Sequence, residues 1–201
     1  MRREASADYS ECKPRASMTR QVLFVQGGGA RVHDEWDQKL VDSLRRELGP
    51  TWQVRYPRMP HEGDPDYATW SAALRKELAG LDDGAIVVAH SIGGTILINA
   101  LAEHPPERKL GAVILVSAPF VGEGGWPPDG WQPQPGLGGK LPGEAAVYLF
   151  HGLADDTAPP AHAELYARAI PQARLVRLPG RDHQLNDDLR EVAAVIVAEG
   201  G

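Results

Sequence analysis

Short apolar runs alternate with amphipathic helical patterns from residue 21 to the end of the chain. Six runs predict strands, at 21–26, 52–56, 85–89, 112–117, 146–150 and 174–178. The runs at 85–89 and 112–117 are apolar almost throughout, as strands buried on both faces are. Strands that alternate with helices are typical of a parallel sheet covered on both sides. The pattern therefore predicts a three-layer α/β/α fold around a six-stranded parallel sheet.

Helical patterns fill the intervals between these runs, at 34–48, 66–80, 92–103, 160–169 and 186–199. The first has an apolar residue at every fourth position: Trp36, Leu40, Leu44 and Leu48. We expect Asp66 and Asn186 to cap the second and last helices, because short polar side chains can accept the free N–H groups there. The pattern at 92–103 is apolar almost all round, which predicts a buried helix.

Length and composition exclude several classes of protein. The 201 residues fit one domain. With 21 Lys and Arg against 27 Asp and Glu, the net charge of −6 argues against a nucleic-acid or membrane-surface protein. The single cysteine, Cys12, excludes an internal disulfide framework. No apolar run approaches a membrane span or a secretory signal. We expect a cytoplasmic protein with a flexible tail at 1–20 and one domain at 21–201.

The segment 89–94, AHSIGG, joins the third predicted strand to the helix at 92–103. A serine between small residues at such a junction is the pattern of a nucleophile elbow, whose tight turn exposes the hydroxyl group. The usual first glycine is Ala89 here, and this departure weakens the match. The alternative is that Ser91 only caps the helix. We take Ser91 as the candidate nucleophile.

Two later loops carry the residue types that a serine nucleophile needs, a base and an acid that orients it. They are 151–159 (HGLADDTAP) and 179–183 (PGRDH), and they follow the fifth and sixth predicted strands. Both loops leave the carboxyl ends of strands, on the same side of the sheet as Ser91. The order along the chain, serine, aspartate and then histidine, is that of α/β-hydrolases.

These three segments resemble the α/β-hydrolase superfamily over about residues 21–199. The lack of a cap domain and the stretch Arg58-Met59-Pro60 resemble its small serine-hydrolase branch, which includes retinoblastoma-binding protein 9. The resemblance implies Asp155 as the acid and His183 as the base. Asp156 remains a competitor for the acid, whereas Asp182 is poorly placed beside His183.

Two further groups of residues complete the predicted site. The N–H groups of Ile92 and, by resemblance, Gly28 are expected to form the oxyanion hole. Fourteen of the 26 residues in 119–144 are Gly or Pro. This segment is expected to roof a substrate pocket, or else to be a surface loop whose aromatic residues are incidental. The predicted substrate contacts are Phe120, Trp126, Trp131 and Met59.

The other histidines have structural interpretations. His151 matches a strand-end position that is usually structural, and the His90 side chain is expected to leave the elbow in another direction. The remaining four are expected in loops or on helix surfaces: His33, His61, His104 and His162.

The chain also lacks the patterns of cofactor and metal sites. The glycine loop at 27–29 has neither the full dinucleotide fingerprint nor a P-loop lysine, and there is no His-Glu-x-x-His motif. We therefore expect a serine hydrolase without cofactor or metal that acts on an ester or related acyl bond of a small molecule. The alternative is a catalytically silent interaction protein on the same fold.

Overall fold

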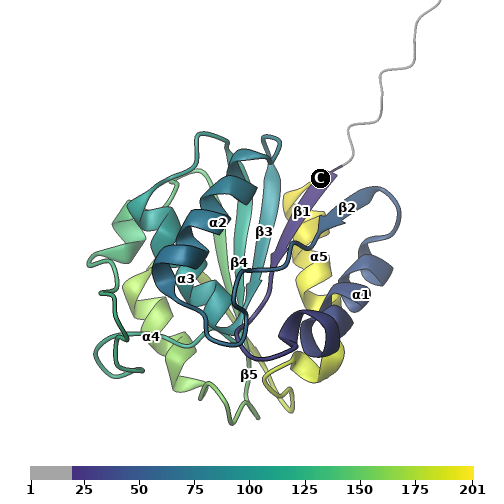
Figure 1. Cartoon of the computed structure of the whole chain (residues 1–201). Helices are drawn as coiled ribbons and strands as arrows, with labels where there is room; N and C mark the ends of the chain where they lie inside the picture. The colour runs from purple at the N-terminus through teal and green to yellow at the C-terminus, as the bar shows by residue number, and fades with distance from the viewer. Residues whose placement is uncertain (1–19) are drawn as a thin grey trace, which may run out of the picture.

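The computed structural model describes residues 20–201 (Figure 1). The predicted tail lies outside the described residues, except for Arg20, which opens the first strand. The strands are β1 Arg20–Val25, β2 Trp52–Arg55, β3 Ala85–His90, β4 Leu110–Val116, β5 Ala146–Gly152 and β6 Arg174–Leu178. They form one sheet in the order β2-β1-β3-β4-β5-β6, with every neighbouring pair parallel. The six-stranded parallel sheet is confirmed.

Five α-helices pack against this sheet. They are α1 Asp37–Leu48, α2 Tyr67–Ala79, α3 Ser91–Glu103, α4 Ala161–Ala169 and α5 Arg190–Glu199. Three shorter helical segments join them: a π-helical turn η1 Val32–Trp36 and the 3-10 turns η2 Leu137–Lys140 and η3 Leu185–Asp187. The one helical segment within 119–144 is η2, so the sheet carries no separate cap domain there.

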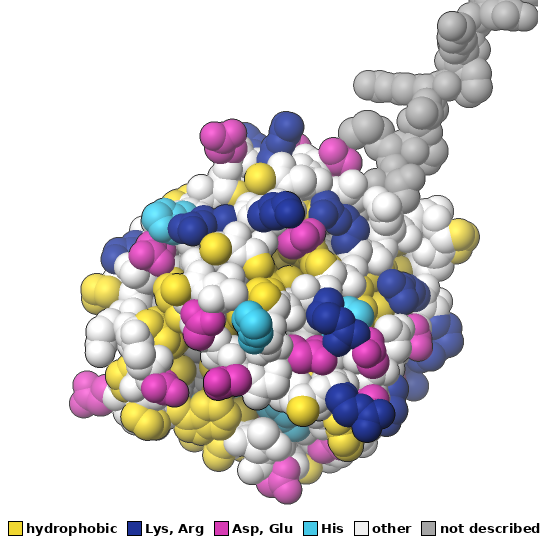
Figure 2. Space-filling view, viewed as in Figure 1, with side chains coloured by type: hydrophobic (Ala, Val, Ile, Leu, Met, Phe, Trp, Pro, Cys, Tyr) yellow, Lys and Arg dark blue, Asp and Glu magenta, His cyan; other side chains and the backbone are white. Residues whose placement is uncertain are grey.

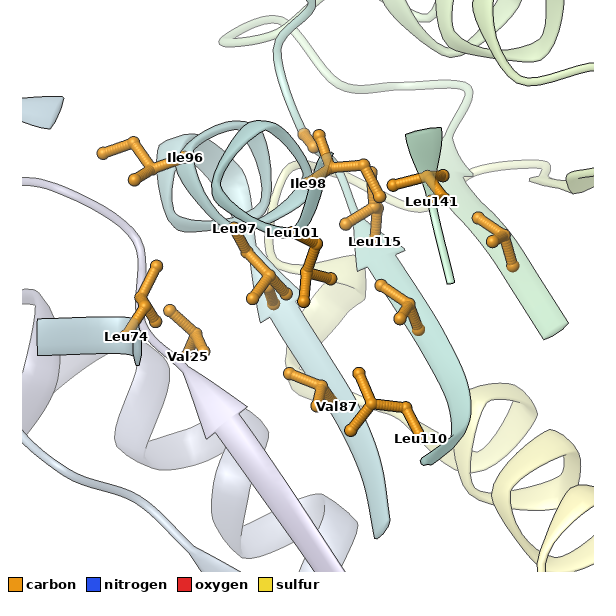
Figure 3. Close-up of a cluster of buried hydrophobic side chains, with 14 of the residues drawn as sticks. Val25, Leu74, Val87, Ile96, Leu97, Ile98, Leu101, Leu110, Leu115 and Leu141 are labelled. Atoms are coloured by element: carbon orange, nitrogen blue, oxygen red, sulfur yellow. The ribbon is translucent and has the colours of Figure 1, made fainter. Parts of the chain in front are cut away.

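The helices form two layers because successive side chains of a strand point to opposite faces. Leu23 and Val25 of β1 pack with α2, α3 and α4, whereas Val22 and Phe24 pack with α1 and α5. Figure 3 shows the first layer, in which side chains of β1, β3 and β4 point toward Leu97 of α3. The expected burial of α3 on nearly all sides is confirmed.

Two predicted helix starts are wrong. The first α-helix begins at Asp37, because the π-helical turn precedes it, and this turn leaves Trp36 half exposed instead of in the buried stripe. The last begins at Arg190 and not at Asn186. Asn186 has a left-handed backbone with φ of 57° and exchanges hydrogen bonds with Asp182, a local pairing that replaces the expected cap. Asp66 does cap α2, by accepting the Thr69 N–H.

The winding of the sheet reverses at β1, which lies between β2 and β3. Val25 pairs with Ala89, so the loops that follow β1 and β3 emerge side by side at the carboxyl edge. In open α/β sheets, ligands bind at this kind of reversal. The surface in Figure 2 mixes acidic and basic side chains without a large area of one sign. No helix within residues 20–201 is long and apolar enough to cross a bilayer.

Candidate active site

Ser91 occupies a strained turn between β3 and α3. Its φ of 51° is left-handed, a conformation that non-glycine residues rarely adopt and that often marks functional sites. The two glycines after it are required by close packing: a Cβ on Gly93 would overlap the Gln26 carbonyl oxygen, and one on Gly94 would lie 3.0 Å from the Ala118 Cβ. Ala89 is fully buried in β3, so its methyl group fits where the elbow pattern has glycine.

His183 lies between Ser91 and Asp155, although the three residues come from different loops. Its Nε2 is 3.0 Å from the Ser91 Oγ, and its Nδ1 is 2.9 Å from an Asp155 carboxylate oxygen, Oδ2. Because a carboxylate only accepts, Nδ1 carries the hydrogen and a neutral ring leaves Nε2 free to accept the serine proton. The structure therefore brings together the candidate nucleophile, base and acid in the arrangement that acyl transfer requires.

Asp155 is held ionised by its surroundings. Its Oδ1 accepts the N–H groups of Thr157 and Ala158, both at 2.9 Å, and its Oδ2 also lies 3.2 Å from the His151 Nε2. Burial alone would raise the pKa of this carboxyl group. The contacts with His151 and His183 outweigh burial and hold the pKa well below its usual range. Asp155 is therefore a carboxylate, and in this charged form it can orient the His183 imidazole.

The two other aspartates near these loops are placed differently. Asp156 is exposed to solvent. Asp182 accepts the N–H of Asn186 and thereby stabilises the turn that carries His183. Neither carboxylate contacts the His183 ring. The geometry thus favours Asp155 over its competitor Asp156.

The glycine loop after β1 offers one unused donor. The Gly27 N–H donates to Asp37, and the Gly29 N–H donates to the Glu62 carbonyl oxygen. Within residues 20–201, the Gly28 N–H has no acceptor. Gly28 also packs so closely on Ile92 that an added Cβ would lie 2.8 Å from the Ile92 Cγ2. The two predicted oxyanion donors are thus neighbours at the cavity that contains Ser91.

That cavity has a volume of about 610 Å³ and mostly apolar walls. Val32, Trp36, Pro65, Ile92 and Trp126 supply these walls. Among the lining residues the ionisable side chains are Asp37, His90 and His183, with no lysine or arginine. Sequence reasoning missed the contribution of Trp36, because its spacing matched a core stripe.

The four predicted substrate contacts have four different locations. Trp126 lines the cavity at Ser91, whereas Phe120 lines a second cavity under the same segment. Trp131 lies outside both cavities and stacks on Tyr67. The expectation for Met59 is wrong, because its side chain is only 1% exposed and packs in the core. The Met59 N–H donates to the Gln26 side chain, which keeps this segment beneath the glycine loop.

His162 explains how Trp126 is held, and it is not the surface residue expected. It is buried, its Nδ1 accepts the Phe120 N–H at 2.8 Å, and its ring packs edge-on against Trp126. Burial lowers the pKa of His162, in keeping with a neutral ring that accepts a hydrogen bond. The backbone N–H of Trp126 in turn donates to the Phe120 carbonyl oxygen. Residues 120–126 therefore form a closed turn anchored on α4.

The fold and this arrangement define a protein of the α/β-hydrolase class. The chain belongs to the serine hydrolase family, whose model matches residues 22–188. No curated protein matches the chain at a significant level.

Solved structures share the fold. The ydeN gene product of B. subtilis has a TM-score of 0.71 at 21% identity, covering 90% of this chain and 98% of that one. An esterase domain of a Rhodothermus marinus protein has a TM-score of 0.62 at 19% identity, covering 90% and 85%. Est1E from Butyrivibrio proteoclasticus, with ferulic acid bound, has a TM-score of 0.63 at 16% identity, covering 90% and 87%.

Within residues 20–201, no three metal-binding side chains lie close enough together to hold an ion.

Proposed function

We propose that this serine hydrolase cleaves carboxylic esters through an acyl-enzyme intermediate. The observation that carries the proposal is the hydrogen-bonded series from Asp155 through His183 to Ser91, at an apolar cavity. In this proposal Ser91 is the nucleophile, His183 the general base and Asp155 the orienting acid. The N–H groups of Gly28 and Ile92 bind the oxyanion.

The reaction has two halves. In the first, Ser91 Oγ attacks the ester carbonyl carbon while His183 Nε2 takes the hydroxyl proton, and the negative charge on the carbonyl oxygen is stabilised by the two N–H groups. The protonated imidazole then gives this proton to the departing alcohol. In the second half, His183 takes a proton from a water that attacks the acyl carbon, the bond from that carbon to Ser91 Oγ breaks, and Oγ receives the proton from the imidazolium as the carboxylic acid leaves. The Asp155 carboxylate stabilises the imidazolium each time it forms.

A fluorophosphonate probe and short p-nitrophenyl esters test this proposal directly. We expect the folded protein to be labelled at Ser91, as located by mass spectrometry of its peptides, and to release p-nitrophenol. Such probes react with a serine only when a base and an oxyanion hole activate it. A folded protein that neither reacts with the probe nor hydrolyses any ester would instead support the catalytically silent interaction protein.

The walls of the cavity favour neutral, apolar acyl groups or aryl alcohols. The lining has no lysine or arginine that could pair with a substrate carboxylate, and Trp36 and Trp126 offer aromatic faces. The absence of a cap domain in the segment 119–144 also supports placement in the small branch that includes retinoblastoma-binding protein 9.

Variants of Trp126 and Trp131 test whether the segment 119–144 contributes to substrate binding or is only a surface loop. We expect Trp126→Ala to raise KM for p-nitrophenyl octanoate by about tenfold, because one buried aromatic contact is worth roughly 1.5 kcal/mol. Trp131→Ala is the matched control, since that ring stacks on Tyr67 outside the cavity. KM values for both variants, with the acetate ester as the short comparison, are the measurement. Equal KM changes in the two variants would remove Trp126 from substrate binding.

A further inference from the structure

A second aspartate–histidine pair lies beneath the proposed catalytic residues. Asp37, the first residue of α1, and His90, the last residue of β3, are 0% and 2% exposed. The His90 Nδ1 is 2.9 Å from the Asp37 Oδ1. In the described part of the chain neither atom has a hydrogen-bond partner, so the ion pair is what compensates the burial of both.

His90 faces an acceptor on both sides of its ring. Its Nε2 is 3.1 Å from the backbone carbonyl oxygen of His183. A carbonyl oxygen only accepts, so Nε2 must carry a hydrogen, and Nδ1 carries one toward the Asp37 carboxylate. Burial alone would lower the pKa of His90, but the Asp37 carboxylate and the His183 carbonyl outweigh it and leave the pKa raised. The raised pKa and the acceptor on each side of the ring both favour the imidazolium form of His90, paired with the buried Asp37 carboxylate.

The same carboxylate holds the glycine loop. The Asp37 Oδ2 accepts the Gly27 N–H at 2.6 Å, directly before Gly28, which offers its own N–H to the oxyanion. His90 binds the backbone of the residue that acts as the base, and the two imidazole rings lie 4.9 Å apart. The pair thus connects the two loops whose separation decides whether the base and the oxyanion donors can act on one carbonyl group.

We infer that Asp37 and His90 are positioning residues, which hold the Gly28 donor and the His183 base at the separation that the transition state requires. The inference rests on the proposed function. A buried ion pair is a weak source of stability, because removing both charges from water costs about as much as their attraction returns. The hydrogen bonds from Asp37 to the glycine loop and from His90 to the His183 carbonyl group give the pair a role that packing alone does not explain.

Asp37→Asn is the sharpest test, because it removes the charge and keeps the shape. The amide oxygen can accept the Gly27 N–H, and the amide nitrogen can donate to a neutral His90. We expect kcat on p-nitrophenyl butyrate to fall about ten- to a hundredfold, the effect of a small misplacement of catalytic groups, with KM changed less than about threefold. Titrating active sites with the fluorophosphonate probe restricts the comparison to folded protein.

Asp42→Asn is the matched control. Asp42 lies on the same helix, is exposed, and within the described residues accepts a hydrogen bond from Gln38 and pairs with the exposed Arg45. We expect its kcat to equal that of the wild type.

The dependence of kcat on pH separates positioning from packing. A raised pKa means that the ion pair is complete below the ordinary histidine value of about 6.5 and is lost as pH rises through the folded value. The ionisable groups around His90 are Asp37 from α1, Asp155 from the loop after β5 and His183 from the loop after β6. We expect the wild-type advantage over Asp37→Asn to be largest near neutral pH and to shrink at alkaline pH. A constant ratio across the range overturns the inference.

His90→Gln changes the other member of the pair, and its kcat is the measurement to use if Asp37→Asn does not fold. Residues that act as a unit have non-additive effects, so the double variant should lose no more kcat than the worse single variant. Fully additive losses, or single variants with wild-type kcat, overturn the inference. If the folded wild type itself has no activity, the proposed function fails instead, so the two failures are distinguishable.

Discussion

Replacing Ser91 by alanine should reduce ester turnover by about 10⁴- to 10⁶-fold and abolish fluorophosphonate labelling. The loss is this large because, within residues 20–201, the Ser91 Oγ is the one hydroxyl oxygen hydrogen-bonded to the His183 Nε2, at 3.0 Å. The residual rate should come from the oxyanion donors and the binding cavity alone. Initial rates on p-nitrophenyl butyrate and gel detection of the probe are the two measurements.

The same variant should keep its fold. Ser91 is only partly buried, and alanine removes a single oxygen, so the thermal midpoint should stay within about 2 °C of the wild type. Ser71→Ala, at a buried serine on α2 that does not line the cavity, provides the control for loss of a hydroxyl group in general. Labelling of Ser91→Ala at the wild-type rate would remove Ser91 from the mechanism.

Asp155→Asn should lower kcat by about 10⁴, the loss measured when a triad aspartate becomes asparagine in a serine protease. The amide can donate to Nδ1, which would put the ring hydrogen on Nε2 and leave it unable to take the serine proton. Asp156→Asn is the matched control, since that carboxylate is exposed and should cost less than about twofold. The reverse ranking of the two variants would move the acid by one position.

Stability at low pH offers a second measurement on the same pair of variants. Because the pKa of Asp155 is lowered in the folded state, its carboxylate stabilises the protein above the ordinary value of about 3.9. This stabilisation is lost as pH falls from there through the lowered folded value. The free energy of unfolding should therefore fall less steeply below pH 4 in Asp155→Asn than in Asp156→Asn. Equal slopes would mean that Asp155 is not held ionised.

The candidate nucleophile, base and acid could be selected from the sequence for a local reason. Each follows a predicted strand, and parallel strands present their carboxyl ends at one edge of the sheet. A short segment such as AHSIGG also encodes its own turn, since small residues are needed around a strained serine. Both signals lie within a few neighbouring residues, so they can be recognised without knowing any distant contact.

The residues that sequence reasoning missed or misplaced depend on long-range contacts. Asp37 was not among the candidate residues, and folding buries it on α1 against His90 of β3. Trp36 was expected in the core, but a π-helical turn exposes it to the cavity. Met59 was expected at the substrate pocket, but the Gln26 side chain holds its segment in the core. His162 was assigned to a helix surface that the turn at 120–126 covers.

The sequence by itself determined the order of strands and helices, the three-layer arrangement and the edge of the sheet where the site lies. Apolar periodicity reports which side of each element is buried, and it is read within a few residues. Only the tertiary structure decided which buried polar groups meet, as between His90 and the carbonyl group of His183, 93 residues later. Such a contact is set by the packing of separate loops and leaves no periodic trace, because its energy arises only after the sheet has brought both ends together.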